Sequence, residues 1–336
     1  MDKSLRIAGT LVLAQAFSLF CYADCPPPRC DTSRTIITVG FAPGGATDIL
    51  ARRLAQGLNI QWGASSATVE NMPGQQGLIA AAAVSRAAPD GGYALLATSN
   101  LNTASALNPK FGFSPEKDLI PAGLVASVPF SIAVASAINV NSMSELVSKA
   151  KESPGRFSYG SSGWGSMEHI LSETLNRSAG IQVSHVPYKG AQPVLTDLIG
   201  GQIQYMISSP ILAEEGARQG RIRVIATTGR NRSPKSPNIP TVAEQGMQDL
   251  TIENRIVLYV PRGTSADALS KWNAAVAKAV QSPEMKQFIE QQGGTIDAPA
   301  PERLGQLISA ETGRWAAAIR SANISCLLYT SDAADE

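Results

Sequence analysis

Two glycine-rich turns carry the residue types that favour anion binding. Pro43–Gly45 follows the β-rich run Ile36–Val39 and precedes the helical pattern Ala46–Leu58. Ser161–Ser166 follows Phe157–Tyr159 and leads into a helical pattern in the same way. Glycine lets the backbone turn tightly and lets a ligand approach closely. The first N–H groups of a helix lack partners inside it, and the helix dipole places roughly half a positive charge there. Both turns therefore predict sites where an anion is favoured.

Strands and helices must position these turns, and the chain alternates the two. The β-rich runs are Ile36–Val39, Ala67–Glu70, Tyr93–Ala97, Ser131–Ala135, Phe157–Tyr159, Val183–Val186, Gln204–Ile207, Val224–Thr227 and Ile256–Val260. The helical patterns are Ala46–Leu58, Gly77–Ala87, Met143–Lys151, Ser166–Ala179, Gln192–Ile199, Ile211–Gln219, Ala266–Val280 and Pro301–Ala322. This alternation predicts an α/β architecture with mostly parallel sheets. The apolar run Ile120–Ala137, broken by prolines, is interpreted as two extended pieces that cross between domains.

The distance between the two turns predicts two lobes. They lie about 120 residues apart, so they face each other only if the chain forms two lobes with a cleft between them. The length of 336 residues fits about two domains. Ile49, Leu50, Leu54 and Leu58 recur at helical spacing, which predicts an apolar stripe on the helix after the first turn.

The two ends of the chain are assigned to other roles. Lys3 and Arg6 precede an uncharged apolar stretch, and the segment 1–23 has the pattern of a cleaved secretory signal peptide. Export would place Cys25 and Cys30, in the leader 24–33, in an oxidising compartment, where they either form a small disulfide or stay unpaired. The segment 323–336 breaks the preceding helical pattern, and we interpret it as a foreign tail without function.

Composition excludes several classes of protein. Hydrophobic residues make up 44% and charged residues 16%, which is a globular composition. The formal net charge is +1, so no global field favours a nucleic acid as partner. Only two His and four Cys are present, which leaves few ligands for a transition metal. We expect no cofactor and no metal.

An ordered series of motifs resembles a known family. The motifs are Phe41–Asp48 (FAPGGATD), Val69–Gly74 followed by Gly77, Ala88–Gly91, Tyr159–His169 (YGSSGWGSMEH), His185–Gly190, Leu195–Gln202, Ile239–Gly246 and Val260–Thr264. Together they resemble the Bug family, the TctC-like extracytoplasmic solute receptors of tripartite tricarboxylate transporters. The resemblance covers roughly residues 34–322, which is nearly all of the chain after the leader.

The resemblance implies a fold and a function. The fold is the type II periplasmic-binding-protein fold, in which two α/β lobes close on a ligand by hinge motion. Lobe 1 would comprise residues 34–129 and 255–322, and lobe 2 residues 130–254. The expected function is periplasmic capture of a small carboxylate and its delivery, without chemistry, to the membrane subunits of a transporter. The expected receptor is a monomer with no catalytic residues.

The resemblance also implies a set of ligand-binding residues. One half of the site would come from the first turn and the strand end beside it, and the other half from the second turn. The residues are Ala42, Pro43, Gly44, Gly45, Asp48, Thr98, Ser99, Asn100, Ser161, Ser162, Gly163, Trp164, Gly165, Ser166, His169, Ser208 and Ser209.

Several of these residues have a second interpretation. Asp48 is interpreted first as shaping the Pro43–Gly45 loop, because a carboxylate that faced a carboxylate ligand would repel it. His169 lies on the same helix face as Ser166 and either contacts the ligand or fastens the loop. His185 is assigned a structural hydrogen bond, and Lys189 a solvated or inter-lobe edge.

Two departures from the family pattern concern specificity. Trp164 stands inside the second turn, where smaller or polar residues are common, and it would either stack on a flat ligand or pack between the lobes. Arg255, in the stretch 254–256 where the family often has an aromatic pair, would either bind a second carboxylate or lie at the hinge surface.

Other functions are less well supported. A secreted serine hydrolase would need G-x-S-x-G, whereas the segment 160–164 ends in Trp164. A catalytic dyad of Ser162 with His169 or His185 is left open within that alternative. A ligand sensor with the same fold is a third alternative. Neither glycine turn gives G-x-G-x-x-G, so a dinucleotide site has no support.

Overall fold

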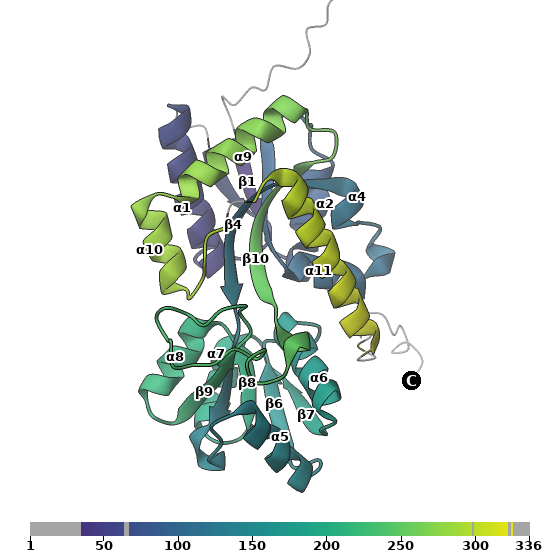
Figure 1. Cartoon of the computed structure of the whole chain (residues 1–336). Helices are drawn as coiled ribbons and strands as arrows, with labels where there is room; N and C mark the ends of the chain where they lie inside the picture. Colours follow the sequence, from purple (N-terminus) through teal and green to yellow (C-terminus); the bar gives the residue numbers. More distant parts are fainter. Residues whose placement is uncertain (1–34, 64–66, 298, 322–323, 325–336) are drawn as a thin grey trace, which may run out of the picture.

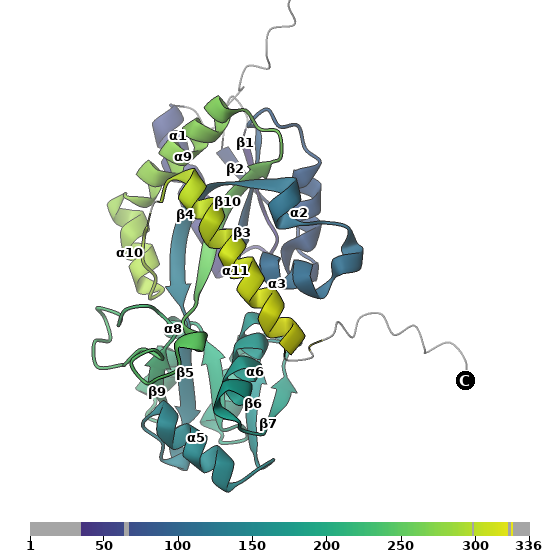
Figure 2. The same ribbon diagram turned by 45° about the vertical axis from the view of Figure 1, so that its right-hand side comes forward.

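The computed structural model describes residues 35–63, 67–297, 299–321 and 324. The proposed signal peptide, the leader and its two cysteines lie outside the described residues. The described chain forms two lobes, each built on a mixed sheet, and Figures 1 and 2 show the lobes joined by the long strands β4 and β10.

The first lobe contains the sheet with strand order β2-β1-β3-β10-β4. Its strands are β1 (Thr35–Val39), β2 (Ala67–Asn71), β3 (Tyr93–Thr98), β4 (Leu119–Pro129) and β10 (Glu253–Pro261). β1 pairs in parallel with β2 and β3, whereas β10 is antiparallel to β3 and β4.

The second lobe contains the sheet with strand order β7-β6-β8-β5-β9. Its strands are β5 (Ser131–Ala135), β6 (Phe157–Ser161), β7 (Val183–Pro187), β8 (Tyr205–Ser208) and β9 (Ile222–Thr227). β6 is parallel to β7 and β8, and β5 is antiparallel to β8 and β9.

The expectation of mostly parallel sheets is confirmed for strand direction, because four of the five strands in each sheet run the same way. Half of the pairings in each sheet are antiparallel, and they involve β10 in one sheet and β5 in the other. These strands adjoin the two crossings between lobes: β4 leads through Phe130 into β5, and β10 returns to the first sheet. A strand that enters a sheet from the opposite lobe runs against the strands that are linked by helical crossovers.

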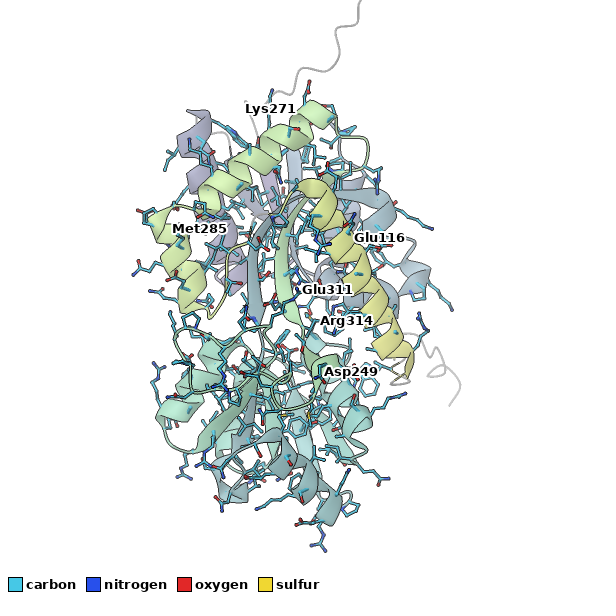
Figure 3. All side chains as sticks on the ribbon, viewed as in Figure 1. Glu116, Asp249, Lys271, Met285, Glu311 and Arg314 are labelled. Carbon is cyan, nitrogen blue, oxygen red and sulfur yellow. The ribbon has the colours of Figure 1, made fainter. Side chains whose placement is uncertain are left out.

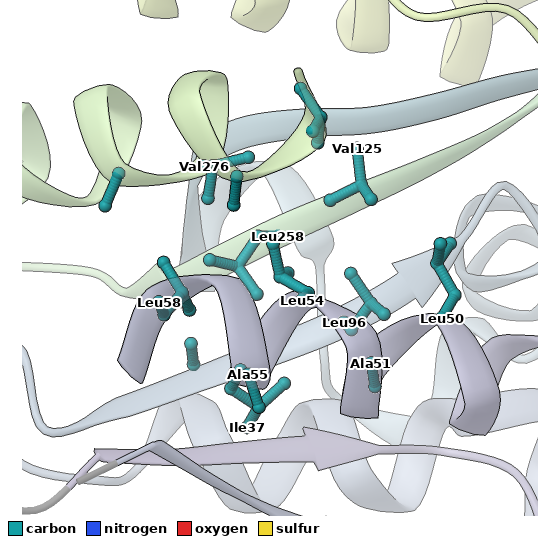
Figure 4. Packing of buried hydrophobic residues seen from close by; sticks show 14 of the residues in the cluster. Ile37, Leu50, Ala51, Leu54, Ala55, Leu58, Leu96, Val125, Leu258 and Val276 are labelled. Carbon is teal, nitrogen blue, oxygen red and sulfur yellow. The ribbon is translucent and has the colours of Figure 1, made fainter. Parts of the chain in front are cut away.

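The apolar stripe predicted on α1 (Ala46–Trp62) packs as expected except at Ile49, which is exposed. Leu50, Leu54 and Leu58 are buried against the first sheet, and Figure 4 shows them facing Leu96, Leu258 and Val276. This packing fixes the helix axis relative to β1, and therefore fixes the turn that joins β1 to α1.

The remaining helices cover the sheets. They are α2 (Leu78–Ser85), α3 (Asn100–Leu107), α4 (Pro115–Asp118), α5 (Met143–Glu152), α6 (Met167–Ala179), α7 (Ala191–Ile199), α8 (Pro210–Arg218), α9 (Ala266–Val280), α10 (Pro283–Gln291) and α11 (Pro301–Ser321), with short 3-10 turns at η1 (Gln75–Gly77), η2 (Pro109–Phe111), η3 (Ser136–Ile138) and η4 (Gln248–Leu250). The helices α3, α4 and α10 were not predicted from the sequence. Among the described helices, none is long and apolar enough to cross a membrane.

The last helix, α11, packs against both lobes. Leu304 and Ile308 belong to a core of the first lobe, whereas Trp315 and Ile319 belong to a core of the second. Arg314 on this helix donates to backbone oxygens of the second lobe, and Figure 3 shows it between Glu311 and Asp249. Ile324, which the sequence analysis placed in the tail, is buried in the same second-lobe core. The folded chain therefore includes residue 324.

Candidate functional site

The first glycine turn leaves its backbone accessible. Ala42, Pro43, Gly44 and Gly45 are all exposed, and they lie between the carboxyl end of β1 and the start of α1. Gly44 has φ +84°, a conformation that L-residues with a side chain rarely adopt. Gly45 is the N-cap and offers no side chain to the first N–H groups of α1. The turn therefore presents donors to whatever lies beside it.

Asp48 holds this turn in shape. Its Oδ2 accepts from the Gly44 N–H at 2.9 Å and from Arg52 Nε at 3.0 Å, and its Oδ1 accepts from Asn71 Nδ2 at 2.9 Å. The hydrogen bond from Arg52, together with those from Gly44 and Asn71, outweighs burial and lowers the pKa of Asp48 to about 2. The carboxylate is thus charged and internally paired, which supports the loop-shaping interpretation.

The second glycine turn is more enclosed than the first. Ser166 caps α6, with its Oγ accepting from the His169 N–H at 3.3 Å. Gly163 and Gly165 have φ +142° and +72°. Ser162 Oγ donates to Glu168 Oε2 at 2.9 Å. The turn between β6 and α6 is therefore fixed by its own hydroxyl groups and by a carboxylate.

A stack of rings backs this turn. The His169 and His185 rings lie parallel with centroids 3.9 Å apart. Tyr159 lies nearly parallel to His185, with centroids 4.9 Å apart, and it is also 6.4 Å from His169, whereas Trp164 is tilted over His169 at 4.6 Å. Tyr159 and His185 are register partners on the adjacent strands β6 and β7, which explains why their side chains meet. Trp164, with 42% of its surface exposed, covers the imidazoles.

Both imidazoles are neutral. Burial, with a smaller contribution from the neighbouring His185, lowers the pKa of His169 to about 3. Burial likewise lowers the pKa of His185 to about 4. His169 Nδ1 accepts from the Gly165 N–H at 3.0 Å, so this histidine fastens the loop.

The two serine–histidine pairs considered from the sequence do not form. Ser162 bonds to Glu168, and it is Ser161 whose Oγ lies 2.7 Å from His185 Nε2. His185 Nδ1 is buried with no hydrogen-bond partner in the described structure. Within the described chain, no carboxylate contacts this imidazole to orient it as a general base. The geometry gives the hydrolase alternative no support.

The other predicted site residues differ in whether their polar atoms are already hydrogen-bonded. Ser99 N–H donates to Asn254 Oδ1 at 3.1 Å, and Ser99 Oγ accepts from the Arg255 N–H at 3.0 Å, so Ser99 joins β3 to β10. Thr98 Oγ1, by contrast, is buried without a partner in the described structure. Asn100 is half-buried at the start of α3. Ser208 is buried and donates to the Ser209 carbonyl, and Ser209 is exposed.

Arg255 is paired within the hinge. Its Nη1 lies 2.7 Å from Glu311 Oε2 on α11, and its Nη2 lies 3.7 Å from Glu253 Oε2. Burial raises the pKa of Glu311 although the Arg255 charge opposes this. The guanidinium is nearly buried and already faces two carboxylates, so the geometry favours a hinge contact over binding of a second ligand carboxylate. Lys189 is exposed.

The two lobes meet beside the second turn. A Cβ on Gly165 would lie 2.6 Å from Leu107 Cδ1 and 3.9 Å from Gln76 Nε2, both in the first lobe. Gln76 belongs to the segment 74–77, in which every residue has positive φ. The sequence analysis missed Gln76 and Asn102, both of which carry a buried side-chain oxygen without a partner in the described structure. The Val69–Gly77 motif encloses Gln76 and marks this segment in the sequence, but a positive φ at glutamine cannot be predicted from the sequence.

A separate cavity lies at the hinge. It measures about 870 Å³ and is lined from both lobes, including Ser127, Arg230, Lys235, Arg255, Lys286 and Gly294. These residues lie along β4 and β10, on α10 and the segment after it, and on the segment after β9, whereas the two glycine turns follow β1 and β6. None of the predicted ligand-binding residues lines it.

Comparison with known proteins decides the family. Residues 50–324 match the tripartite tricarboxylate transporter family receptor, TctC. The chain belongs to this family. The chain is 29% identical over 322 residues to BugT of Bordetella pertussis, a match that covers 95% of this chain and 97% of BugT.

Solved structures of TctC-like proteins share the fold. The periplasmic binding protein BugD is 28% identical, with a TM-score of 0.71 over 89% of this chain and 99% of BugD. MatC of Rhodopseudomonas palustris, solved with malate, is 29% identical, with a TM-score of 0.71 over 85% of this chain and 98% of MatC. Rpa4515 of R. palustris, solved with adipate, is 29% identical, with a TM-score of 0.75 over 87% of this chain and 98% of that protein. The chain is therefore a periplasmic solute-binding receptor of the TctC and Bug type.

The site offers few metal ligands. Within residues 35–63, 67–297, 299–321 and 324, no three His, Cys, Asp or Glu side chains are grouped to hold a metal ion. The polar groups of the two turns are backbone N–H groups, hydroxyls and neutral imidazoles, which suit binding of an organic anion.

Proposed function

We propose that this receptor captures a small carboxylate between the turn 42–45 and the turn 161–166 and delivers it unchanged to a tripartite tricarboxylate-type transporter. The observation that carries the proposal is the contact of the second turn with the first lobe, where Gly165 meets Gln76 and Leu107. The malate and adipate bound by MatC and Rpa4515 support a carboxylate as ligand.

Each turn contributes differently to capture. The exposed first turn offers backbone N–H groups at the start of α1, next to the Asp48–Arg52 ion pair. Asp48 keeps that turn rigid, so little ordering is left to the ligand. The second turn is held by Ser166, His169 and Glu168, and it brings the other lobe to the ligand.

The ligand contacts both lobes only in the closed form, and these contacts drive closure. A ligand shifts the equilibrium between open and closed forms by no more than its difference in affinity for them. A micromolar dissociation constant corresponds to about 8 kcal/mol, which several charge-assisted hydrogen bonds of roughly 1.5–3 kcal/mol each supply after ordering costs. The closed monomer in the periplasm is then the form that the membrane subunits recognise.

Calorimetric titration with a panel of aliphatic and aromatic carboxylates tests this proposal. Gly45 has negative φ, and a Cβ there meets only the Ala42 carbonyl oxygen at 3.6 Å, so Gly45→Val leaves the fold intact. We expect it to weaken binding at least 10-fold by blocking close approach. The matched control is Gly313→Val on the exposed face of α11, where a Cβ meets nothing within 4 Å. The proposal fails if no carboxylate binds, or if both variants bind as the native protein does.

A further inference from the structure

Four side-chain atoms are buried without a partner in the described structure near the contact between the lobes. They are Gln76 Oε1, Thr98 Oγ1, Asn102 Oδ1 and His185 Nδ1. Buried polar atoms in folded proteins almost always have a hydrogen-bond partner, so such atoms mark the place of a missing one. Asn102 and Thr98 are only 3% and 8% exposed, which rules out bulk water as that partner.

Three of these atoms belong to residues that lie on elements next to the contact at Gly165. Gln76 approaches Gly165 directly from the first lobe. Asn102 precedes Ala106 by one turn of α3, and Ala106 packs against the core of the second lobe. His185 stacks on His169, whose Nδ1 accepts from the Gly165 N–H. Both lobes therefore contribute a residue with an unpartnered atom to the elements that meet at this contact.

The hydrogen-bond network allows His185 Nδ1 to act as an acceptor or as a donor. The Gly163 carbonyl oxygen, 3.0 Å from Ser161 Oγ, also accepts from the Ser166 N–H at 3.2 Å. The single Ser161 hydroxyl proton therefore goes either to that oxygen or to His185 Nε2, 2.7 Å away. Nδ1 carries a lone pair in the first case and a proton in the second.

The backbone at Gln76 indicates that this side chain is held in place. Gln75 and Gln76 have φ of +45° and +55°, a region that costs energy for a residue with a side chain. The turn is fixed from behind, because a Cβ on Gly40 would lie 2.5 Å from the Gly77 Cα. Strain of this kind persists where the surroundings enforce it, and it is concentrated at functional sites.

We infer that the ligand carries a hydrogen-bond donor, a hydroxyl or an ammonium group, beside its carboxylate, and that Gln76 and Asn102 recognise that donor. The inference rests on the proposed function, since it concerns the same ligand. The unpartnered oxygens of Gln76 and Asn102 are acceptors, which need N–H or O–H groups, whereas His185 and Thr98 can act in either sense. The carboxylate is left to the backbone N–H groups of the turns.

Matched ligand pairs test the inference on the full chain by calorimetry. The 2-hydroxy acids lactate, malate and mandelate are compared with propionate, succinate and phenylacetate, and the 2-amino acids alanine, aspartate and phenylglycine are added to separate ammonium from hydroxyl. In the pair whose size fits, we expect the donor-bearing acid to bind at least 10-fold more tightly. Equal or tighter binding of the plain acid overturns the inference but leaves the proposed function standing. If no acid in this panel or the wider one binds, the proposed function fails as well.

Two neighbouring substitutions test whether Gln76 causes the preference for the donor-bearing acid. Gln76→Gly removes the acceptor and relieves the positive φ, and Gln75→Gly relieves the same kind of strain at an exposed side chain. We expect Gln76→Gly to reduce the preference for the donor-bearing acid to within about 2-fold while affinity for the plain acid is kept. Gln75→Gly should keep the full preference. Retention of the preference in Gln76→Gly, or equal loss in both variants, contradicts the assignment.

Discussion

His169 and His185 stack with their ring planes 11° apart and their centroids 3.9 Å apart, and the rings of Tyr159 and Trp164 lie beside them. The stack ties the strand–helix turn of the second lobe to the adjacent strand β7, because His169 accepts from the Gly165 N–H and His185 contacts Ser161. Both histidines must stay neutral for this arrangement, so the shape of the turn depends on pH.

Stability should fall as the pH drops below about 6.5. The pKa values of His169 and His185 are about 3 and about 4 in the folded protein, below the ordinary value of 6.5 in an unfolded chain. The unfolded state therefore binds protons first, and the free energy of unfolding decreases from pH 6.5 down to those folded values. We expect the melting temperature to drop by roughly 5–10 °C between pH 7 and pH 5.

Isosteric replacements separate this effect from other titrations. In His169→Asn the side-chain oxygen takes the place of Nδ1, and in His185→Gln the amide N–H takes the place of Nε2. The doubly substituted protein should show a flatter dependence of melting temperature on pH over that range. An unchanged slope would mean that other groups cause the acid sensitivity.

Asp48 should matter more for stability than its partner Arg52. Asp48→Ala leaves the Gly44 N–H without its acceptor and Asn71 Nδ2 with only the Phe41 carbonyl oxygen, which should lower the free energy of unfolding by about 1–3 kcal/mol. Arg52→Ala removes only the 51%-exposed partner and should cost less than about 1 kcal/mol. Urea unfolding of the two variants measures both values, and an equal cost would contradict the role of Asp48 in shaping the loop.

The sequence predicts the first turn and the helix behind it well, because both are local. The leucine stripe of α1 and the glycines before it need only helical spacing and glycine's conformational freedom. The roles of Ser99 and His185 depend on partners at a distance. Ser99 is engaged by Asn254 and Arg255, and His185 meets Tyr159 only because β7 pairs with β6. Strand pairing between distant segments is not encoded in local patterns.

The helix α3 was missed for a related reason. Its sequence NLNTASAL is polar enough to be taken for a loop, and it becomes helical where Leu101 and Ala104 pack on the first lobe and Leu107 on the second. Tertiary contacts decide the conformation of such a segment more than propensity does. Asn102 was missed as a site residue together with the helix that carries it.

Gly165 should be indispensable for contact between the lobes. Gly165→Ala places a Cβ 2.6 Å from Leu107 Cδ1, in a backbone conformation of φ +72°. We expect a loss of carboxylate affinity of at least 10-fold. Leu107→Ala in the same chain removes the clash but not the backbone strain, so it should restore part of the affinity. Additive losses in the double-mutant cycle would show that the two residues do not meet in the ligand-bound form.

Arg255 and Glu311 form an ion pair in the hinge, and the buried Glu311 should depend on Arg255 for its stability. Arg255→Leu leaves Glu311, whose side chain is 4% exposed, without its cation, and should cost about 3–5 kcal/mol in the free energy of unfolding. Replacing both residues with Leu should recover most of that loss, because no charge is then left buried. Unfolding in urea measures the cycle, and a double variant no more stable than Arg255→Leu would contradict this account of the pair.

Capture of a carboxylate between the two turns is tested most directly by following backbone amide signals of the glycines during a carboxylate titration by NMR. The account predicts saturable shifts at Gly44, Gly45, Gly163 and Gly165, with Gly293 and Gly294 of the hinge cavity unaffected. Shifts confined to Gly293 and Gly294 would place the ligand in the hinge cavity and contradict capture between the turns.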